Sequence, residues 1–132
     1  NTTTEKFEVY EGVWQNMVGG GGASTIDALT DGSTSGGTQS VYLGASAGGA
    51  ASGADNNVAL GYQALANNSA GDFNTALGSR ALVDANGDNN IGIGYQAGSG
   101  SSAAARYRNI FIGRDAGTSV TGADDNVMIG DG

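Results

Sequence analysis

A short motif returns six times between residue 40 and the end of the chain, and it limits the possible folds more than any other feature. It reads Asn (Ser in the first copy), an apolar β-former, a free position, Leu or Ile, then Gly, with Ala three residues later in five copies. The motif glycines are separated by 17, 17, 16, 19 and 17 residues. A helical repeat needs about 33 residues for two helices and a turn. The period therefore favours a β-solenoid with one coil in each repeat.

Each motif predicts a short strand that is apolar on both of its faces. In the second copy Val58 and Leu60 share one face, while Ala59 points to the other. A half-exposed strand alternates apolar with polar residues, so we expect one face to line the coil and the other to meet a neighbour. We expect two short strands and two turns in each coil. The predicted core or contact-face residues are Val58, Leu60, Leu77, Ile91, Ile93, Ile110, Ile112, Val127 and Ile129.

Glycine and asparagine mark the two ends of each predicted strand. Gly is expected where the backbone turns sharply or enters positive φ, and Asn tolerates the left-handed region before a strand. Stacked coils would place the Asn side chains about 4.8 Å apart, which allows a ladder of amide hydrogen bonds. The predicted structural turn positions are Gly44, Gly61, Gly78, Gly94, Gly113, Gly130, Asn57, Asn74, Asn90, Asn109 and Asn126.

The chain divides into three predicted parts. Residues 1–18 predict a β-hairpin, with strands near 6–10 and 13–17 around a Glu11-Gly12 turn. Residues 19–39 are rich in Gly, Ser and Thr and predict a linker, with at most a short strand or turn near 25–29. Residues 40–132 predict the solenoid. An isolated hairpin is marginal in water, so the first part is expected to pack across chains, with Trp14 as its anchor rather than as a ligand platform.

The repeats resemble a known group of fibrous proteins. Asn57-Val-Ala-Leu-Gly-Tyr-Gln-Ala64 and Asn90-Ile-Gly-Ile-Gly-Tyr-Gln-Ala97 are similar to the YadA-like heads of trimeric autotransporter adhesins. They resemble the related repeats of bacteriophage tail fibres even more closely, although the adhesin heads use shorter coils. Residues 1–14 also look like a small module of tail-fibre proteins. The resemblance implies an all-β, left-handed parallel β-roll or β-solenoid of about six coils that associates with two identical chains as a homotrimer.

The same resemblance carries expectations about maturation and location. In phage fibres with similar repeats, a self-cleaving C-terminal intramolecular chaperone often follows, so Gly132 is expected to be the end left by such a cleavage. The implied location is the virion, in contact with other fibre or tail proteins, and the alternative is a bacterial cell surface.

Composition and motif content argue against several other classes. The chain has 13 acidic and 5 basic residues, a net charge of −8, which has the wrong sign for a nucleic-acid partner. It lacks Cys, His, a phosphate-binding loop and carboxylates at a fixed spacing, so we expect neither an enzyme nor a cofactor. Calcium at the Asp/Asn turns is an alternative, but the nine-residue repeat of calcium-binding β-rolls is missing. No stretch approaches the roughly 20 apolar residues of a membrane span.

Two groups of residues are candidate receptor contacts. Tyr62 and Tyr95 occupy the same slot after the strand glycine, where they would either stack on sugars or pack against the next coil or chain. Arg106, Tyr107 and Arg108 lie in the longest spacer, where they would contact a receptor or form salt bridges to acids such as Asp88 or Asp124.

The sequence therefore predicts a structural and host-recognition segment of a homotrimeric extracellular fibre. The favoured setting is the distal part of a phage tail fibre that attaches to a glycan or protein on a bacterial surface. The alternatives are the head of a bacterial trimeric adhesin and, more remotely, a polysaccharide depolymerase.

Overall fold

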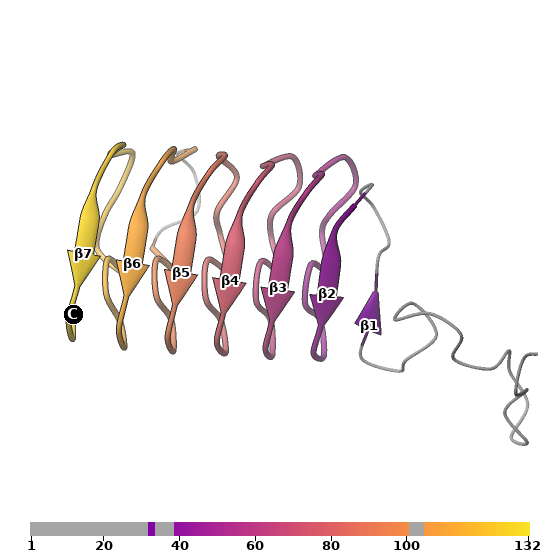
Figure 1. The fold of residues 1–132 in the computed structure, drawn as a ribbon, viewed down its shortest axis with the longest axis horizontal. Coiled ribbons are helices and arrows are strands. Elements are labelled where there is room, and N and C mark those ends of the chain that lie inside the picture. Colours follow the sequence, from indigo (N-terminus) through magenta and orange to yellow (C-terminus); the bar gives the residue numbers. More distant parts are fainter. Residues whose placement is uncertain (1–31, 34–38, 101–104) are drawn as a thin grey trace, which may run out of the picture.

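The computed structural model describes residues 32–33, 39–100 and 105–132. Their strands form one sheet in chain order (Figure 1). The strands are β1 (Gly32–Ser33), β2 (Val41–Leu43), β3 (Val58–Leu60), β4 (Thr75–Leu77), β5 (Ile91–Ile93), β6 (Ile110–Ile112) and β7 (Val127–Ile129). β1 pairs with β2 in the antiparallel sense, and every later neighbouring pair is parallel. The hairpin predicted at residues 1–18 and the strand or turn near 25–29 lie outside the described residues, and β1 falls within the predicted linker.

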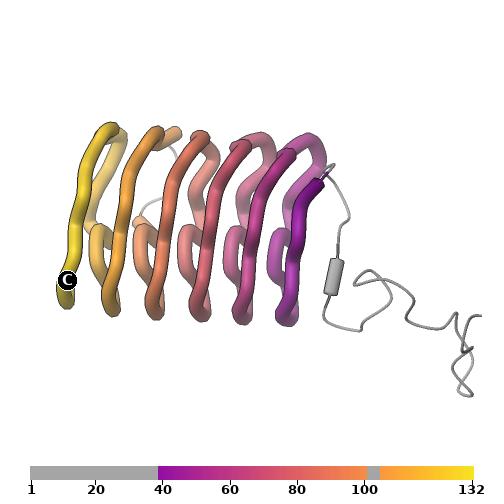
Figure 2. The backbone as a smooth tube through the Cα atoms, in the orientation of Figure 1, coloured from indigo at the N-terminus to yellow at the C-terminus, as the bar shows by residue number. Residues whose placement is uncertain are grey.

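The six parallel strands β2–β7 belong to a β-solenoid of about five turns, as the stacked loops of Figure 2 show. The predicted all-β solenoid is confirmed, and the described residues contain no helix. The expectation of two strands in each coil was wrong, because the described part of every coil has a single strand. The return path contains Leu65 and Leu82 at φ 52° and 49°, which an extended strand does not allow. Hydrogen bonds between coils nevertheless continue there, from Leu65 N–H to Ala81 O at 3.1 Å and from Leu82 N–H to Ala97 O at 2.9 Å.

The middle residue of each strand points into the coil. Ala59 and Ala76 are fully buried in this position, and each is small. The space that they leave is filled by Leu65 and Leu82, which lie six residues later and are also fully buried. The middle strand residue and the turn residue six positions later thus fill the interior of the coil together.

The coils that carry an aromatic residue in the middle position reverse this arrangement. Tyr42 and Phe111 are buried, and the residue six positions after each is Gly48 or Gly117. A Cβ atom at Gly48 would lie only 2.6 Å from the ring of Tyr42, so the turn has room for the aromatic ring only because it carries Gly. The middle strand position can therefore vary in size between repeats, because the turn residue six positions later is large where the strand residue is small and small where it is large.

A ladder of asparagines, buried except at Asn126, joins successive coils just before the strands. The left-handed backbone predicted for these asparagines lies one residue earlier instead, as at Asn56 and Asn89 with φ of 57° and 61°. Asn74 N–H donates to Asn57 Oδ1 at 2.8 Å, and Asn90 N–H donates to Asn74 Oδ1 at 2.9 Å. The ladder continues through Asn109 to Asn126 at 3.1 and 3.0 Å. The Asn74 Nδ2 group also donates to Gly87 O at 2.8 Å, which holds the turn that precedes the strand of the next coil. The ladder therefore fixes the register that places the same residue types at the same corner of each coil.

Candidate interaction surfaces

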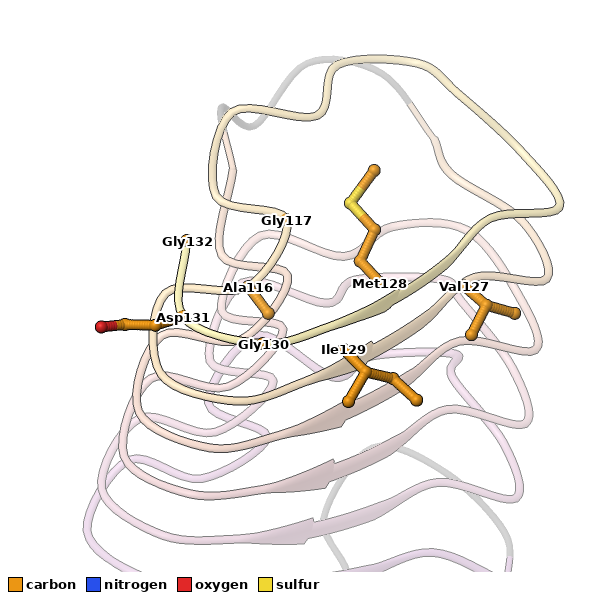
Figure 3. A pocket seen from close by; sticks show the side chains of 8 residues that line it. All are labelled: Ala116, Gly117, Val127, Met128, Ile129, Gly130, Asp131 and Gly132. Atoms are coloured by element: carbon orange, nitrogen blue, oxygen red, sulfur yellow. The ribbon is translucent and has the colours of Figure 1, made fainter.

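The outer face of the sheet is apolar along the whole of β2–β7. Because strand residues alternate, the first and third residue of each strand point away from the interior. Figure 3 shows this at β7, where Met128 points into the coil while Val127 and Ile129 point away from it. The outer positions are Val41, Leu43, Val58, Leu60, Thr75, Leu77, Ile91, Ile93, Ile110, Ile112, Val127 and Ile129, with Thr75 the one polar member.

This outer face includes every residue that the sequence predicted for the core or contact face, and it lies outside the coil. Leu60 and Leu77 remain 43% and 44% exposed, and Val58 45%. Monomeric soluble proteins rarely expose an apolar patch that is this continuous, and such patches mark contact surfaces.

Arg106, a predicted receptor contact, lies inside the coil with 2% of its surface exposed. Its Nη2 donates to Gly98 O at 2.6 Å and its Nη1 to Val120 O at 3.3 Å, and the guanidinium carbon lies 5.8 Å from the centroid of the Phe111 ring. Burial lowers the pKa of Arg106, and the negative charge of Asp84 acts in the opposite direction. A receptor cannot reach this side chain while the coil is closed.

The interior has room for Arg106 because the two positions that fill the other coils are both glycine in the fourth coil. Its middle strand residue is Gly92 and the residue six positions later is Gly98, so both sources of filling are missing. Leu82 and Phe111, from the coils on either side, reach into this space, since a Cβ atom at Gly98 would lie within 2.6 Å of both side chains.

Tyr107 and Arg108 lie near the surface at the start of the sixth strand. Arg108 forms a two-pronged salt bridge with Asp125 at 2.6 and 3.0 Å, so its partner is neither Asp88 nor Asp124 as predicted. The hydrogen bond between them raises the pKa of Arg108 and lowers the pKa of Asp125. Tyr107 is half-buried, and its N–H donates to Asp124 Oδ1 at 2.9 Å.

The acidic turn residues have a structural role. Asp72 Oδ1 accepts a hydrogen bond from Asp55 N–H at 2.7 Å, and Asp88 Oδ1 accepts one from Asp72 N–H at 2.9 Å. Each carboxylate thus satisfies a backbone donor of the adjacent coil. Within the described residues there is no group of three or more Asp or Glu side chains that could hold a metal ion.

Tyr62 and Tyr95 stay largely in solvent at the corner that follows the strand glycine, with 55% and 46% of their surfaces exposed. Ser79 occupies the same slot in the coil between them, and Arg80 follows Ser79. Backbone hydrogen bonds from Arg80 N–H to Tyr62 O (2.8 Å) and from Gln96 N–H to Ser79 O (3.0 Å) hold the three coils in register here. The two tyrosines therefore occupy equivalent positions on one edge of the solenoid.

The last described coil leaves a shallow pocket at the end of the solenoid (Figure 3). Its lining is Ala116, Gly117, Val127, Met128, Ile129, Gly130, Asp131 and Gly132. No further described strand covers β7, and Val127 and Ile129 are the most exposed members of the outer face, at 66% and 72%.

Among the residues that the structure describes, none belongs to a helix long and apolar enough to cross a membrane. Comparisons of the chain with protein-family models, with curated proteins and with solved structures give no significant match.

Proposed function

We propose that this chain is a rod-like segment of a homotrimeric extracellular fibre, most simply the distal part of a phage tail fibre that attaches to a bacterial surface. The observation that carries the proposal is the outer apolar face of β2–β7. It forms a straight strip along the solenoid axis, and its residues change little from coil to coil.

The energetics of the outer face favour association. Fully burying an exposed Leu or Ile side chain stabilises by about 1.5–3 kcal/mol. Leu60 and Leu77 are already half covered by their neighbours in the sheet, so covering the remainder is worth on the order of 1 kcal/mol for each. The eleven apolar positions together contribute on the order of 10 kcal/mol per chain, which is as large as the stability of many small domains.

The choice of three chains and of a fibre rests on the resemblance of the repeats to adhesin heads and phage fibres. In the left-handed trimers of that group, three flat strips pack around a common axis. A cyclic trimer of this kind buries the same strip on every chain and leaves the turns on the outside.

The oligomeric state can be measured by light scattering on the chain of residues 1–132. We expect three times the chain mass of 13.0 kDa. Leu77→Asp, which puts a charge in the middle of the strip, should abolish the trimer, while Ser119→Asp, an added charge at an exposed turn, should keep it. Leu77→Thr copies Thr75 and retains a strand-forming residue, so it should weaken the trimer without unfolding the chain. A stable folded monomer of the unmodified chain would contradict the proposal.

The virion setting can be tested independently. Antibodies raised against residues 40–132 should decorate the tips of tail fibres in electron micrographs of phage particles. Decoration of the bacterial cell surface instead would favour the alternative of an adhesin head.

A further inference from the structure

The corner with the two exposed tyrosines has the composition of a ligand-binding surface. We call it the tyrosine surface and define it by Tyr62, Gln63, Ser79, Arg80, Tyr95 and Gln96. These residues fill the first and second positions after the motif glycine in three successive coils. Neighbouring strands lie about 4.8 Å apart, so the two tyrosines, two coils apart, are separated by about 10 Å along the solenoid axis. Ser79, in the same slot of the coil between them, carries a much smaller side chain than either tyrosine.

The backbone holds this arrangement rigidly. Gln63, Arg80 and Gln96 have φ of 55°, 59° and 55°, so all three take the same left-handed backbone conformation. The hydrogen bonds from Arg80 N–H to Tyr62 O and from Gln96 N–H to Ser79 O tie the coils together at this corner. The backbone of this corner is therefore already ordered before a ligand binds, which removes one part of the entropy cost of binding.

The tyrosine surface is locally positive on an acidic protein. Residues 61–66, 78–83 and 94–99 contain no Asp or Glu, although the net charge of the chain is −8. Arg108 is paired with Asp125 and Arg114 with Asp115, while Arg106 is buried. Arg80 is exposed and forms no ion pair with any residue that the structure describes, so its guanidinium is available to an anion from outside the chain.

We propose that the tyrosine surface binds an acidic polysaccharide, which deepens the proposed function by assigning the recognition step to these residues and therefore rests on it. The two tyrosine rings each stack on the apolar face of a sugar ring. Their separation matches the length of a disaccharide unit in an extended glycan, so they contact alternate rings of the chain. The sugar ring between them lies over the small Ser79, where its carboxylate meets Arg80 in a two-pronged hydrogen bond. The amides of Gln63 and Gln96 donate to and accept from the sugar hydroxyls.

A polysaccharide fits this surface better than a second protein does. A standard protein interface buries about 800 Å² on each partner, with an apolar core surrounded by a polar rim. On the tyrosine surface the aromatic rings are separated by a hydroxyl group and a cation, whereas the outer face of β2–β7 is apolar without interruption. The two surfaces thus suit different partners.

The experiment measures binding of the chain of residues 1–132 to hyaluronan, alginate and polygalacturonate, each compared with its carboxyl-reduced form. We expect at least one acidic polymer to bind, with its reduced form about tenfold weaker. Tyr62→Ala and Tyr95→Ala should each weaken binding about tenfold. Arg80→Gln should weaken binding of the acidic polymer and leave binding of the reduced form unchanged. Phe73→Ala is the matched control. Phe73 is an aromatic residue with 57% of its surface exposed, but it precedes a strand, whereas the tyrosine surface follows the strands. Binding by this variant should be unchanged.

Light scattering on the same samples separates this inference from the fibre proposal. If the chain is trimeric but retains none of the three polymers, the tyrosine surface is not a binding site for acidic glycans, and the fibre proposal stands. If Tyr62→Ala or Tyr95→Ala changes the molecular mass instead of the affinity, the tyrosines are contacts between chains and the inference is overturned. If the chain is monomeric but binds the acidic polymer through Tyr62 and Arg80, the inference holds and the trimer fails.

Discussion

Replacing Gly78 by Ala tests how closely the coils stack. Gly78 has φ +136°, and an added Cβ atom would lie 2.5 Å from the carbonyl oxygen and 2.8 Å from the carbonyl carbon of Gly94 in the next coil. Forcing Ala into this φ costs about 1–3 kcal/mol. Relieving the contact requires the coils to separate, which weakens the hydrogen bond from Gly94 N–H to Leu77 O, now 2.8 Å long, and costs roughly another 1–2 kcal/mol.

Two other glycines separate these costs. Gly130 has φ +143°, but no atom lies within 4 Å of the position of its Cβ, so Gly130→Ala should carry the backbone cost alone. Gly53 has neither a φ in the left-handed region nor an atom within 4 Å. Gly53→Ala should be neutral, or stabilising by about 0.4–1 kcal/mol, because it restricts the unfolded chain.

Thermal unfolding followed by circular dichroism gives the comparison. For a chain of this length, 1 kcal/mol corresponds to a shift in Tm of roughly 3–5 °C. Gly78→Ala should therefore lower Tm by roughly 6–25 °C, and by several degrees more than Gly130→Ala, while Gly53→Ala should not lower it. Equal losses for Gly78→Ala and Gly130→Ala would show that contact between coils contributes nothing and would refute the stacking argument.

The remaining predictions concern the interior polar groups, and the same Tm measurement checks them. Asn74→Ala removes the acceptor of Asn90 N–H and the donor to Gly87 O, so it should destabilise by about 3 kcal/mol, while a loss below about 1 kcal/mol would mean that water replaces the ladder. Arg106→Met removes the guanidinium that donates to Gly98 O and should destabilise the fold by about 1–3 kcal/mol. Arg108→Gln, at an exposed salt bridge, should change Tm far less. A larger loss of Tm for Arg108→Gln than for Arg106→Met would indicate that Arg106 lies at the surface.

The repeat was sufficient to predict the parallel solenoid. Its period excludes helical units, and the apolar residues on either side of one free position define a strand of three residues, as seen in Val58–Leu60 and Ile91–Ile93. The single strand in each coil was missed because the return path also contains apolar residues, such as Leu65 and Leu82. Their positive φ follows from the tight closure of the coil, which composition does not reveal. β1 was missed because Gly32–Ser33 has no apolar pattern.

The position of Arg106 was the largest error about the candidate site. A basic residue in a long spacer is normally exposed. Arg106, however, stands three residues before the motif Asn, a position at which the other coils carry Ala54, Gly71, Gly87 and Ala123. The relevant information lies elsewhere in the sequence, in the combination of Gly92 with Gly98. In the other complete coils at least one of these two slots carries a large side chain, so a coil with Gly in both must be filled by side chains from other positions. Comparing the middle residue of each strand with the residue six positions later would have indicated that the interior of the fourth coil has space for another side chain.

The interior and the outer face follow different rules, and the difference bears on the proposed assembly. Inside the coil, residue size varies from Gly92 to Phe111 at one repeat position, because the turn of the same coil or a side chain from the next one compensates. On the outer face no other described residue packs against these side chains or restricts their size. Eleven of the twelve positions are nevertheless Val, Leu or Ile. Water imposes no such uniformity and would tolerate polar residues at every one of these positions. A straight partner that runs along the whole axis would impose it, since each coil then meets the same environment. That is the environment three such strips would create around a common axis.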